Sequence, residues 1–125
     1  MRKSAVLLIS PFDEERAMYS EYLQVQGFDV VEQREPSHAI ATVSGQAIGA
    51  VVAHVRQNGP VDGIALTRAL RRELGNSVAV LLLSTAIDPV VRARALAANC
   101  DRFLLVPCAP EELVREIRMT FGERP

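Results

Sequence analysis

The 125-residue chain has one lysine, Lys3, and all its other basic side chains are arginines. It has no tryptophan and only two cysteines, Cys100 and Cys108, which do not form a CxxC motif and lie far in sequence from both histidines. This spacing argues against a zinc site and predicts two unpaired thiols in a reducing compartment. We therefore expect a cytoplasmic protein that binds no metal and no other cofactor.

Long apolar runs and an excess of positive charge are also missing. No segment approaches the roughly 18 consecutive apolar residues of a membrane span, and the apolar run near the N-terminus is too short for a signal peptide. With 14 basic and 15 acidic residues, the formal net charge is −1, which argues against a nucleic-acid-binding surface. We expect no membrane and no nucleic-acid partner, and the length fits one domain over residues 1–125.

Short apolar runs alternate with amphipathic segments along the whole chain. This alternation predicts an α/β fold of the flavodoxin-like, three-layer type, with a five-stranded parallel sheet in order 2-1-3-4-5 and five helices on its two faces. The third and fourth runs lack polar alternation, as in strands covered on both faces. The predicted strands are 5–10, 28–33, 47–55, 77–84 and 102–106, and the predicted helices are 11–27, 36–45, 61–75, 88–99 and 110–121.

Helix ends are predicted from capping residues. Asp13, Ser37 and Asp88 have side chains that suit the N-cap position, where an oxygen accepts a free backbone N–H. Asp62 is expected in a turn or at an N-cap rather than in catalysis. The helix stops are predicted at Gly27, Gly45 and Gly75.

The third predicted strand ends in an unusual residue for this kind of fold, His54. In open parallel sheets the carboxyl ends of the strands form the functional crevice. From Pro36 to Val61 there is no aspartate or glutamate, so no carboxylate ends this strand. We expect His54 to fill the crevice and to hydrogen-bond Ser84 or a backbone carbonyl. The alternative is a pH-sensitive group with a pKa near its usual value of about 6.5.

Three segments together are similar to the response-regulator receiver domain. Residues 27–30, GFDV, match the receiver pattern G-[FY]-x-V that enters the second strand. Residues 61–71, VDGIALTRALR, resemble the M-D-G-x-x-L segment after the third strand. Residues 81–117 resemble the pattern of an apolar strand ending in Ser or Thr, followed by A-L-x-A-G-A-x-x-[YF]-L-x-K-P. The resemblance covers about residues 4–121.

The resemblance implies a phosphorylation site that this sequence does not reproduce. In receivers an acidic pair after the first strand holds Mg²⁺, an aspartate ending the third strand takes the phosphoryl group, and a lysine after the fifth strand holds its oxygens. Here the acidic pair falls on Ser10 and Pro11. The phosphoacceptor falls on His54, or on Val55 if the loop carries no insertion, and the lysine falls on Val106. Lys3 is too far away in sequence to replace it.

Three receiver positions keep the family's residue type. Ser84 matches the hydroxyl residue after the fourth strand, and Phe103 matches the switch aromatic of the fifth strand. Pro107 matches the proline that follows the lysine, which in the family is preceded by a cis peptide bond. The chain is therefore expected to be a degenerate receiver that takes up no phosphate at the usual site.

Two other functions remain open from the sequence. One is a residual phosphate-responsive regulator that uses His54 or another surrogate acceptor. The other is a small enzyme built on His54, Ser84 and Cys108, with Cys108 approaching His54 across the crevice. Asp13 is a possible lone metal ligand, but one carboxylate makes a poor magnesium site.

A degenerate receiver would act through protein–protein contacts. In receivers the surface formed by the fourth helix, fifth strand and fifth helix often dimerises. Here that surface is expected to carry Arg92, Arg94, Arg115 and Arg118, and to bind a signalling protein or a second copy of the chain.

Overall fold

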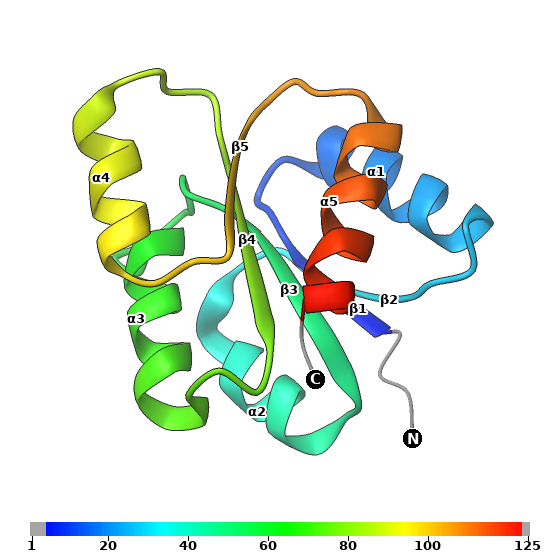
Figure 1. Cartoon of the computed structure of the whole chain (residues 1–125), viewed down its shortest axis with the longest axis horizontal. Coiled ribbons are helices and arrows are strands. Elements are labelled where there is room, and N and C mark those ends of the chain that lie inside the picture. Colours follow the sequence, from blue (N-terminus) through cyan, green and yellow to red (C-terminus); the bar gives the residue numbers. More distant parts are fainter. Residues whose placement is uncertain (1–4, 124–125) are drawn as a thin grey trace.

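Five parallel strands form the centre of the computed structural model, which describes residues 5–123. The strand order β2-β1-β3-β4-β5 is the predicted one, and Figure 1 shows the sheet between two groups of helices. Every residue of β3 and β4 is buried, which explains their unbroken apolar sequences. The strands are β1 (Ala5–Ile9), β2 (Asp29–Gln33), β3 (Ile48–His54), β4 (Ala79–Ser84) and β5 (Arg102–Leu105).

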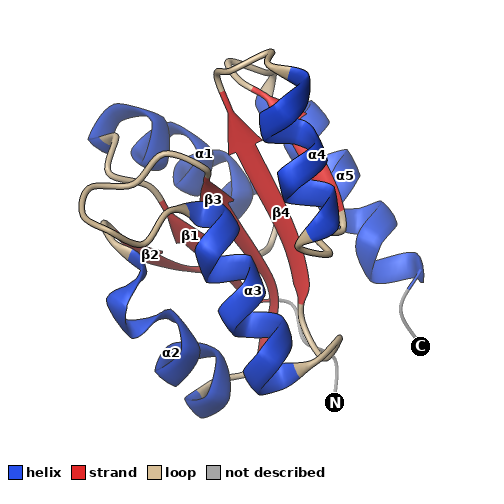
Figure 2. Cartoon of the chain, turned by 90° about the vertical axis from the view of Figure 1, so that its left-hand side faces the viewer, coloured by secondary structure: helices blue, strands red, loops and turns tan. Residues whose placement is uncertain are grey.

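Helices cover both faces of the sheet, and alternate strand residues point to each face. One core cluster joins Leu7, Val51 and Leu82 to α2, α3 and α4. The other joins Leu8 and Leu81 to α1 and α5, and Figure 2 views the molecule from the α2, α3 and α4 side. The helices are α1 (Asp13–Val25), α2 (Ala39–Gly45), α3 (Gly63–Leu74), α4 (Pro89–Ala97) and α5 (Pro110–Glu123), with a 3₁₀ turn, η1 (Pro36–His38), before α2.

Two of the predicted N-caps are wrong. Phe12 occupies the N-cap of α1, and Asp13 is the first helical residue. Ser37 lies inside η1 and its hydroxyl donates to Glu35, because Pro36 begins a helical turn one residue earlier. The helix predicted over 36–45 is therefore divided into η1 and α2.

The other caps agree with the predictions. The carboxylate of Asp88 accepts the N–H of Val90 at the start of α4, and that of Asp62 accepts the N–H of Ala65 at the start of α3. Gly75 follows α3 with φ of 61°, a left-handed conformation that glycine adopts without steric cost. No helix in the described part of the chain is long and apolar enough to cross a membrane.

Candidate functional site

The carboxyl ends of the strands bring most of the candidate residues to one edge of the sheet. β1 and β3 are neighbours, and His54 at the end of β3 pairs in register with Leu83 of β4. Ser10, His54 and Ser84 each expose 2% of their surface or less, and Val106 exposes 7%. The fold therefore buries the expected positions near the carboxyl ends of the strands.

His54 is held as an uncharged ring. Its Nδ1 accepts the backbone N–H of Arg56 at 3.0 Å. Its ring packs edge-on against the Phe12 ring, with 4.9 Å between the two ring centroids. The predicted hydrogen bond of His54 to Ser84 or to a backbone carbonyl is wrong, because the partner that the His54 ring has is a backbone N–H donor, that of Arg56. Since Nδ1 accepts, the neutral ring carries its proton on Nε2, an atom that is buried without a hydrogen-bond partner among the described residues. Burial, helped by the Arg56 charge, lowers the pKa of His54 to about 4.

The Ser84 hydroxyl bonds its own loop. The Ser84 Oγ accepts the N–H of Ala86 at 3.0 Å and contacts the Ala86 carbonyl at 3.4 Å. These contacts close a local turn at the start of the β4–α4 loop. The Ser84 hydroxyl thus stabilises the β4–α4 loop.

Ser10 and Pro11 place no carboxylate after β1. The Ser10 hydroxyl donates to Glu15 Oε1 at 3.3 Å and accepts the N–H of Phe12 at 3.1 Å. Burial raises the pKa of Glu15, and the Ser10 hydrogen bond only partly offsets this. Glu15 could not be singled out from the sequence, because acidic residues are common in the first turn of any helix.

Arg16 is a second residue of the site that the sequence did not reveal. Its guanidinium donates to the Ser10 carbonyl at 2.6 Å, to Asp13 at 2.8 Å and to Glu32 at 3.2 Å. The other oxygen of Asp13 accepts from Arg34 at 2.7 Å. Asp13 is therefore fully engaged by arginines, which lower its pKa, chiefly through the Arg16 hydrogen bond. The i,i+3 spacing of Asp13 and Arg16 was the available sequence signal.

Gln57, in the loop after β3, joins the ends of two strands. Its side-chain nitrogen donates to the His54 carbonyl at 2.7 Å and to the Ile9 carbonyl at 3.3 Å. Its Oε1 is buried without a partner in the described structure. A polar loop residue gives no sequence signal for such a role. Together, Gln57 and Arg16 supply N–H donors to three carbonyls at the ends of β1 and β3.

The segment after β5 contacts α1 through Tyr19. The Val106–Pro107 peptide bond is cis, and the Tyr19 hydroxyl donates to the Cys108 carbonyl at 3.0 Å. The Cys108 sulfur lies 3.6 Å from the same hydroxyl. The alternative in which Cys108 pairs with His54 gains no support, because the Cys108 sulfur and carbonyl contact the Tyr19 hydroxyl.

Phe103 is partly buried and packs against the core cluster on the α2, α3 and α4 side. Lys3 lies outside the described residues. The four arginines of the expected docking surface are all exposed, but they divide between two places. Arg92 and Arg94 lie on α4, whereas Arg118 turns toward α1, where it donates to the Gln26 carbonyl at 3.4 Å and stacks over Phe28.

Comparison with known proteins places this architecture in a family. The model of the response regulator receiver domain matches residues 6–118. The chain belongs to the response regulator receiver domain family. Receivers are signalling modules of two-component systems, so the resemblance inferred from the sequence is confirmed.

One curated relative of this receiver is distant in sequence and longer. The chain is 25% identical over 118 residues to the probable transcriptional regulator ycf27 of Porphyridium aerugineum, covering 94% of this chain and 48% of that protein. It thus spans about half the length of this curated relative.

Solved structures agree with the receiver fold. Chemotaxis protein CheY4 of Vibrio cholerae has a TM-score of 0.85 and 21% identity, over 95% of this chain and 99% of that one. The receiver domain of a putative response regulator NarL of Mycobacterium tuberculosis has a TM-score of 0.86 and 21% identity, over 99% and 100% of the two chains.

The Mg²⁺ that the receiver family implies does not fit the residues of this receiver. Magnesium requires oxygen ligands and usually one or two carboxylates. Here three strand-end carbonyls accept N–H groups from Gln57 and Arg16, and the positions matching the acidic pair are Ser10 and Pro11. No cluster of three or more histidine, cysteine, aspartate or glutamate side chains suited to a metal occurs in the described residues.

Proposed function

We propose that this receiver is a phosphorylation-independent signalling module of the cytoplasm that acts by binding protein partners and is not an enzyme. The proposal rests on one observation: the side chains of Gln57 and Arg16 donate hydrogen bonds to the backbone carbonyls at the ends of β1 and β3. A positively charged guanidinium beside Ser10 repels a divalent cation. Phosphoryl transfer needs that cation, or an equivalent positive charge, against the phosphoryl oxygens.

A surrogate phosphoacceptor role for His54 has little support. Its nitrogen lone pair, the nucleophile that phosphoryl transfer requires, is on Nδ1 and already accepts the Arg56 N–H. The other nitrogen carries the proton and is buried. The side chain matching the lysine position is Val106, which offers no charge to a phosphoryl group.

An enzymatic role for His54, Ser84 and Cys108 has no supporting contact. A nucleophile and its base must lie within hydrogen-bond reach, but Ser84 bonds Ala86 and Cys108 contacts Tyr19. Burial raises the pKa of the Cys108 thiol, which disfavours the reactive thiolate.

The partner face in this proposal is α4–β5–α5, with α4 at its centre. The helix buries Ala95, yet its opposite side is also apolar, with Val90 63% and Leu96 50% exposed. Leu105 of β5, the strand in the same proposed face, is 49% exposed. Exposed apolar patches rimmed by polar residues mark interaction sites. Arg92 and Arg94 flank the patch, so the partner is expected to present apolar and acidic side chains.

The deciding experiment is the intact mass of the protein after incubation with acetyl phosphate and Mg²⁺. We expect no added phosphate on the native chain or on the His54→Ala variant. A variant with Ser10→Asp, Pro11→Asp, His54→Asp and Val106→Lys restores the missing groups and serves as the matched comparison. A phosphate adduct on the native chain that His54→Ala removes would contradict the proposal and make His54 the acceptor of an altered switch.

A further inference from the structure

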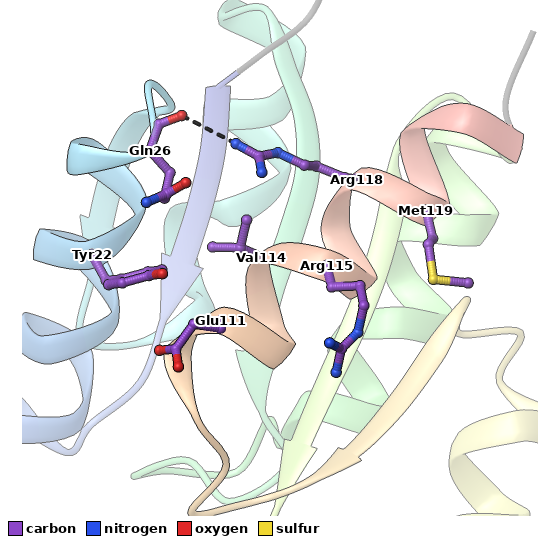
Figure 3. Close-up of a pocket in the computed structure, with 7 residues that line it drawn as sticks. All are labelled: Tyr22, Gln26, Glu111, Val114, Arg115, Arg118 and Met119. Carbon is purple, nitrogen blue, oxygen red and sulfur yellow. Dashed lines mark hydrogen bonds between the residues drawn. The ribbon is translucent and has the colours of Figure 1, made fainter.

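An open hollow of about 430 Å³ lies between α1 and α5, and this volume is within the range of sites for small ligands. Figure 3 shows Tyr22 and Gln26 on its α1 side, Val114 between the two helices, and charged side chains along α5. Its lining includes neither His54 nor Ser84. The hollow is therefore separate from the carboxyl ends of the strands.

The middle of the hollow is apolar and aromatic. Val114 is 4% exposed, and the Tyr22 ring extends from α1 toward it. The Tyr22 hydroxyl and the side-chain amide of Gln26 have no hydrogen-bond partner within residues 5–123. A planar aromatic ligand that rests here buries apolar surface against Val114 and Tyr22, and the free amide is available to its polar atoms.

Opposite charges lie toward the two ends of the hollow. Glu111 and Arg118 are seven positions apart on α5, so about 10 Å of helix axis separates them. Glu111 lies on the Tyr22 side, whereas Arg118 reaches toward Gln26 and donates to its carbonyl at 3.4 Å (Figure 3). Neither charged group forms an ion pair with another residue of the described range. The complementary ligand is elongated, with an anionic group at one end and N–H donors at the other.

A second arginine makes the lining positive on balance. Arg115 is exposed and forms no ion pair in the described part of the chain. Figure 3 shows its side chain directed away from α1, so it attracts an anion from a distance rather than by contact. The Arg118 guanidinium has further N–H donors, whose planar arrangement suits two oxygens of one phosphate.

We propose that this hollow binds a guanine nucleoside monophosphate. The phosphate accepts N–H groups from Arg118, and the base lies against Val114 and the Tyr22 ring, as bases stack on aromatic side chains in other proteins. The ring N–H of guanine and its neighbouring amino group then both donate to the Glu111 carboxylate, which accepts two donors at once. Among the common bases only guanine presents two adjacent donors on one edge.

This inference goes beyond the proposed function, because it assigns a small ligand to a hollow that phosphorylation and the α4 patch do not involve. A chain that binds no nucleotide leaves the mass experiment on phosphorylation unaffected. Phosphate uptake at His54 would likewise leave this nucleotide site unaffected.

Titration of the full chain with guanosine monophosphate tests the proposal, followed by isothermal titration calorimetry and by NMR of the isotope-labelled protein. We expect saturable binding, with chemical-shift changes at Tyr22, Gln26 and the α5 residues of the hollow. Xanthosine monophosphate has a carbonyl oxygen in place of the guanine amino group. It should bind at least about tenfold more weakly, because that oxygen faces the Glu111 carboxylate.

Two variants assign the ends of the ligand. Arg118→Gln should weaken the binding of guanosine monophosphate at least about tenfold but leave that of guanosine, which has no phosphate, unchanged. Glu111→Gln should remove the preference for guanosine over xanthosine monophosphate, because an amide can donate to the xanthine oxygen. Arg72→Gln removes an arginine of α3 that is 71% exposed and is the matched control, which should change neither ligand's affinity.

Circular dichroism of every variant verifies that it is folded. A native chain without saturable shifts at millimolar guanosine monophosphate would overturn the proposal. Inorganic phosphate that shifts the same residues as strongly would also overturn it, because the hollow would then attract anions without recognising a base.

Discussion

At the scale of single residues, the end of β3 holds a buried and neutral histidine. His54 is buried, accepts one backbone N–H and packs its ring edge against Phe12. Its Nε2 is buried without a hydrogen-bond partner among residues 5–123, so protonation of the ring would add a charge that is shielded from water. The pKa of His54, lowered to about 4, expresses that cost. This residue therefore contributes to stability only as long as it is neutral.

The stability of the protein should fall with acid in a window that His54 sets. The folded pKa of about 4 lies below the unfolded value of 6.5, so the unfolded chain binds the proton first. The free energy of unfolding should be fully maintained above pH 6.5 and should decrease toward pH 4, by up to about 3 kcal/mol. Urea unfolding at several pH values between 4 and 6.5 measures how steeply the free energy of unfolding changes with pH.

The control for this prediction is His54→Asn, whose side-chain oxygen can still accept the Arg56 N–H but does not titrate. Its unfolding free energy should change less between pH 6.5 and 4 than that of the native chain. Equal slopes for the two proteins would show that His54 does not carry the pH dependence.

At the scale of elements, the end of β3 and the start of α3 approach each other unusually closely. Gly63 donates its N–H to the Val55 carbonyl at 2.8 Å, and a Cβ added to Gly63 would lie 2.6 Å from the His54 carbonyl oxygen. The backbone of the loop that carries Gln57 is thereby held against the helix. A glycine at this position is required by the close backbone contact.

Gly63→Ala should lower the free energy of unfolding by about 1–3 kcal/mol, because the new methyl group meets backbone rather than a movable side chain. Gly45→Ala is the matched control, since nothing lies within 4 Å of a Cβ at that position. In helix α2 this second change should be neutral or should stabilise by up to about 1 kcal/mol. Denaturant unfolding compares the two, and equal stability of both variants would contradict the close contact.

At the scale of the whole molecule, one largely buried arginine connects elements that are distant in the sequence. Arg71 of α3 donates to the carbonyls of Asn99 at 2.9 Å and Val78 at 2.7 Å, and to the carboxylate of Asp101 at 2.7 Å. The same Asp101 oxygen accepts the N–H of Val80. Helix α3, the start of β4 and the loop before β5 are thus joined opposite the functional edge.

Arg71→Met should destabilise the protein by roughly 3 kcal/mol, because it removes the guanidinium that bonds the partly buried Asp101 carboxylate and two backbone carbonyls. Arg72→Met, one residue along α3, removes an arginine side chain that is 71% exposed and should change stability by less than about 0.5 kcal/mol. Thermal and urea unfolding measure both. An Arg71 variant as stable as the Arg72 variant would mean that the network contributes nothing to the fold.

The sequence by itself determined the strands, their order and the family. Apolar periodicity and helix stops are local signals, and the folded sheet is consistent with all of them. The replacement of the receiver site residues by Ser10, Pro11, His54 and Val106 stays a prediction from the sequence alone. The predicted N-caps Asp13 and Ser37 were wrong because the helical backbone begins at Asp13 itself and at Pro36, the residue before Ser37. Where a helical turn begins depends on the folded backbone and not on the capping residue alone.

Only the tertiary structure decided what occupies the crevice and what remains outside it. Gln57 and Arg16 reach the carbonyls at the ends of β1 and β3 from a loop and a helix, a contact that no spacing in the sequence encodes. Such juxtapositions depend on where the sheet sets each element in space, so they appear only once the chain is folded.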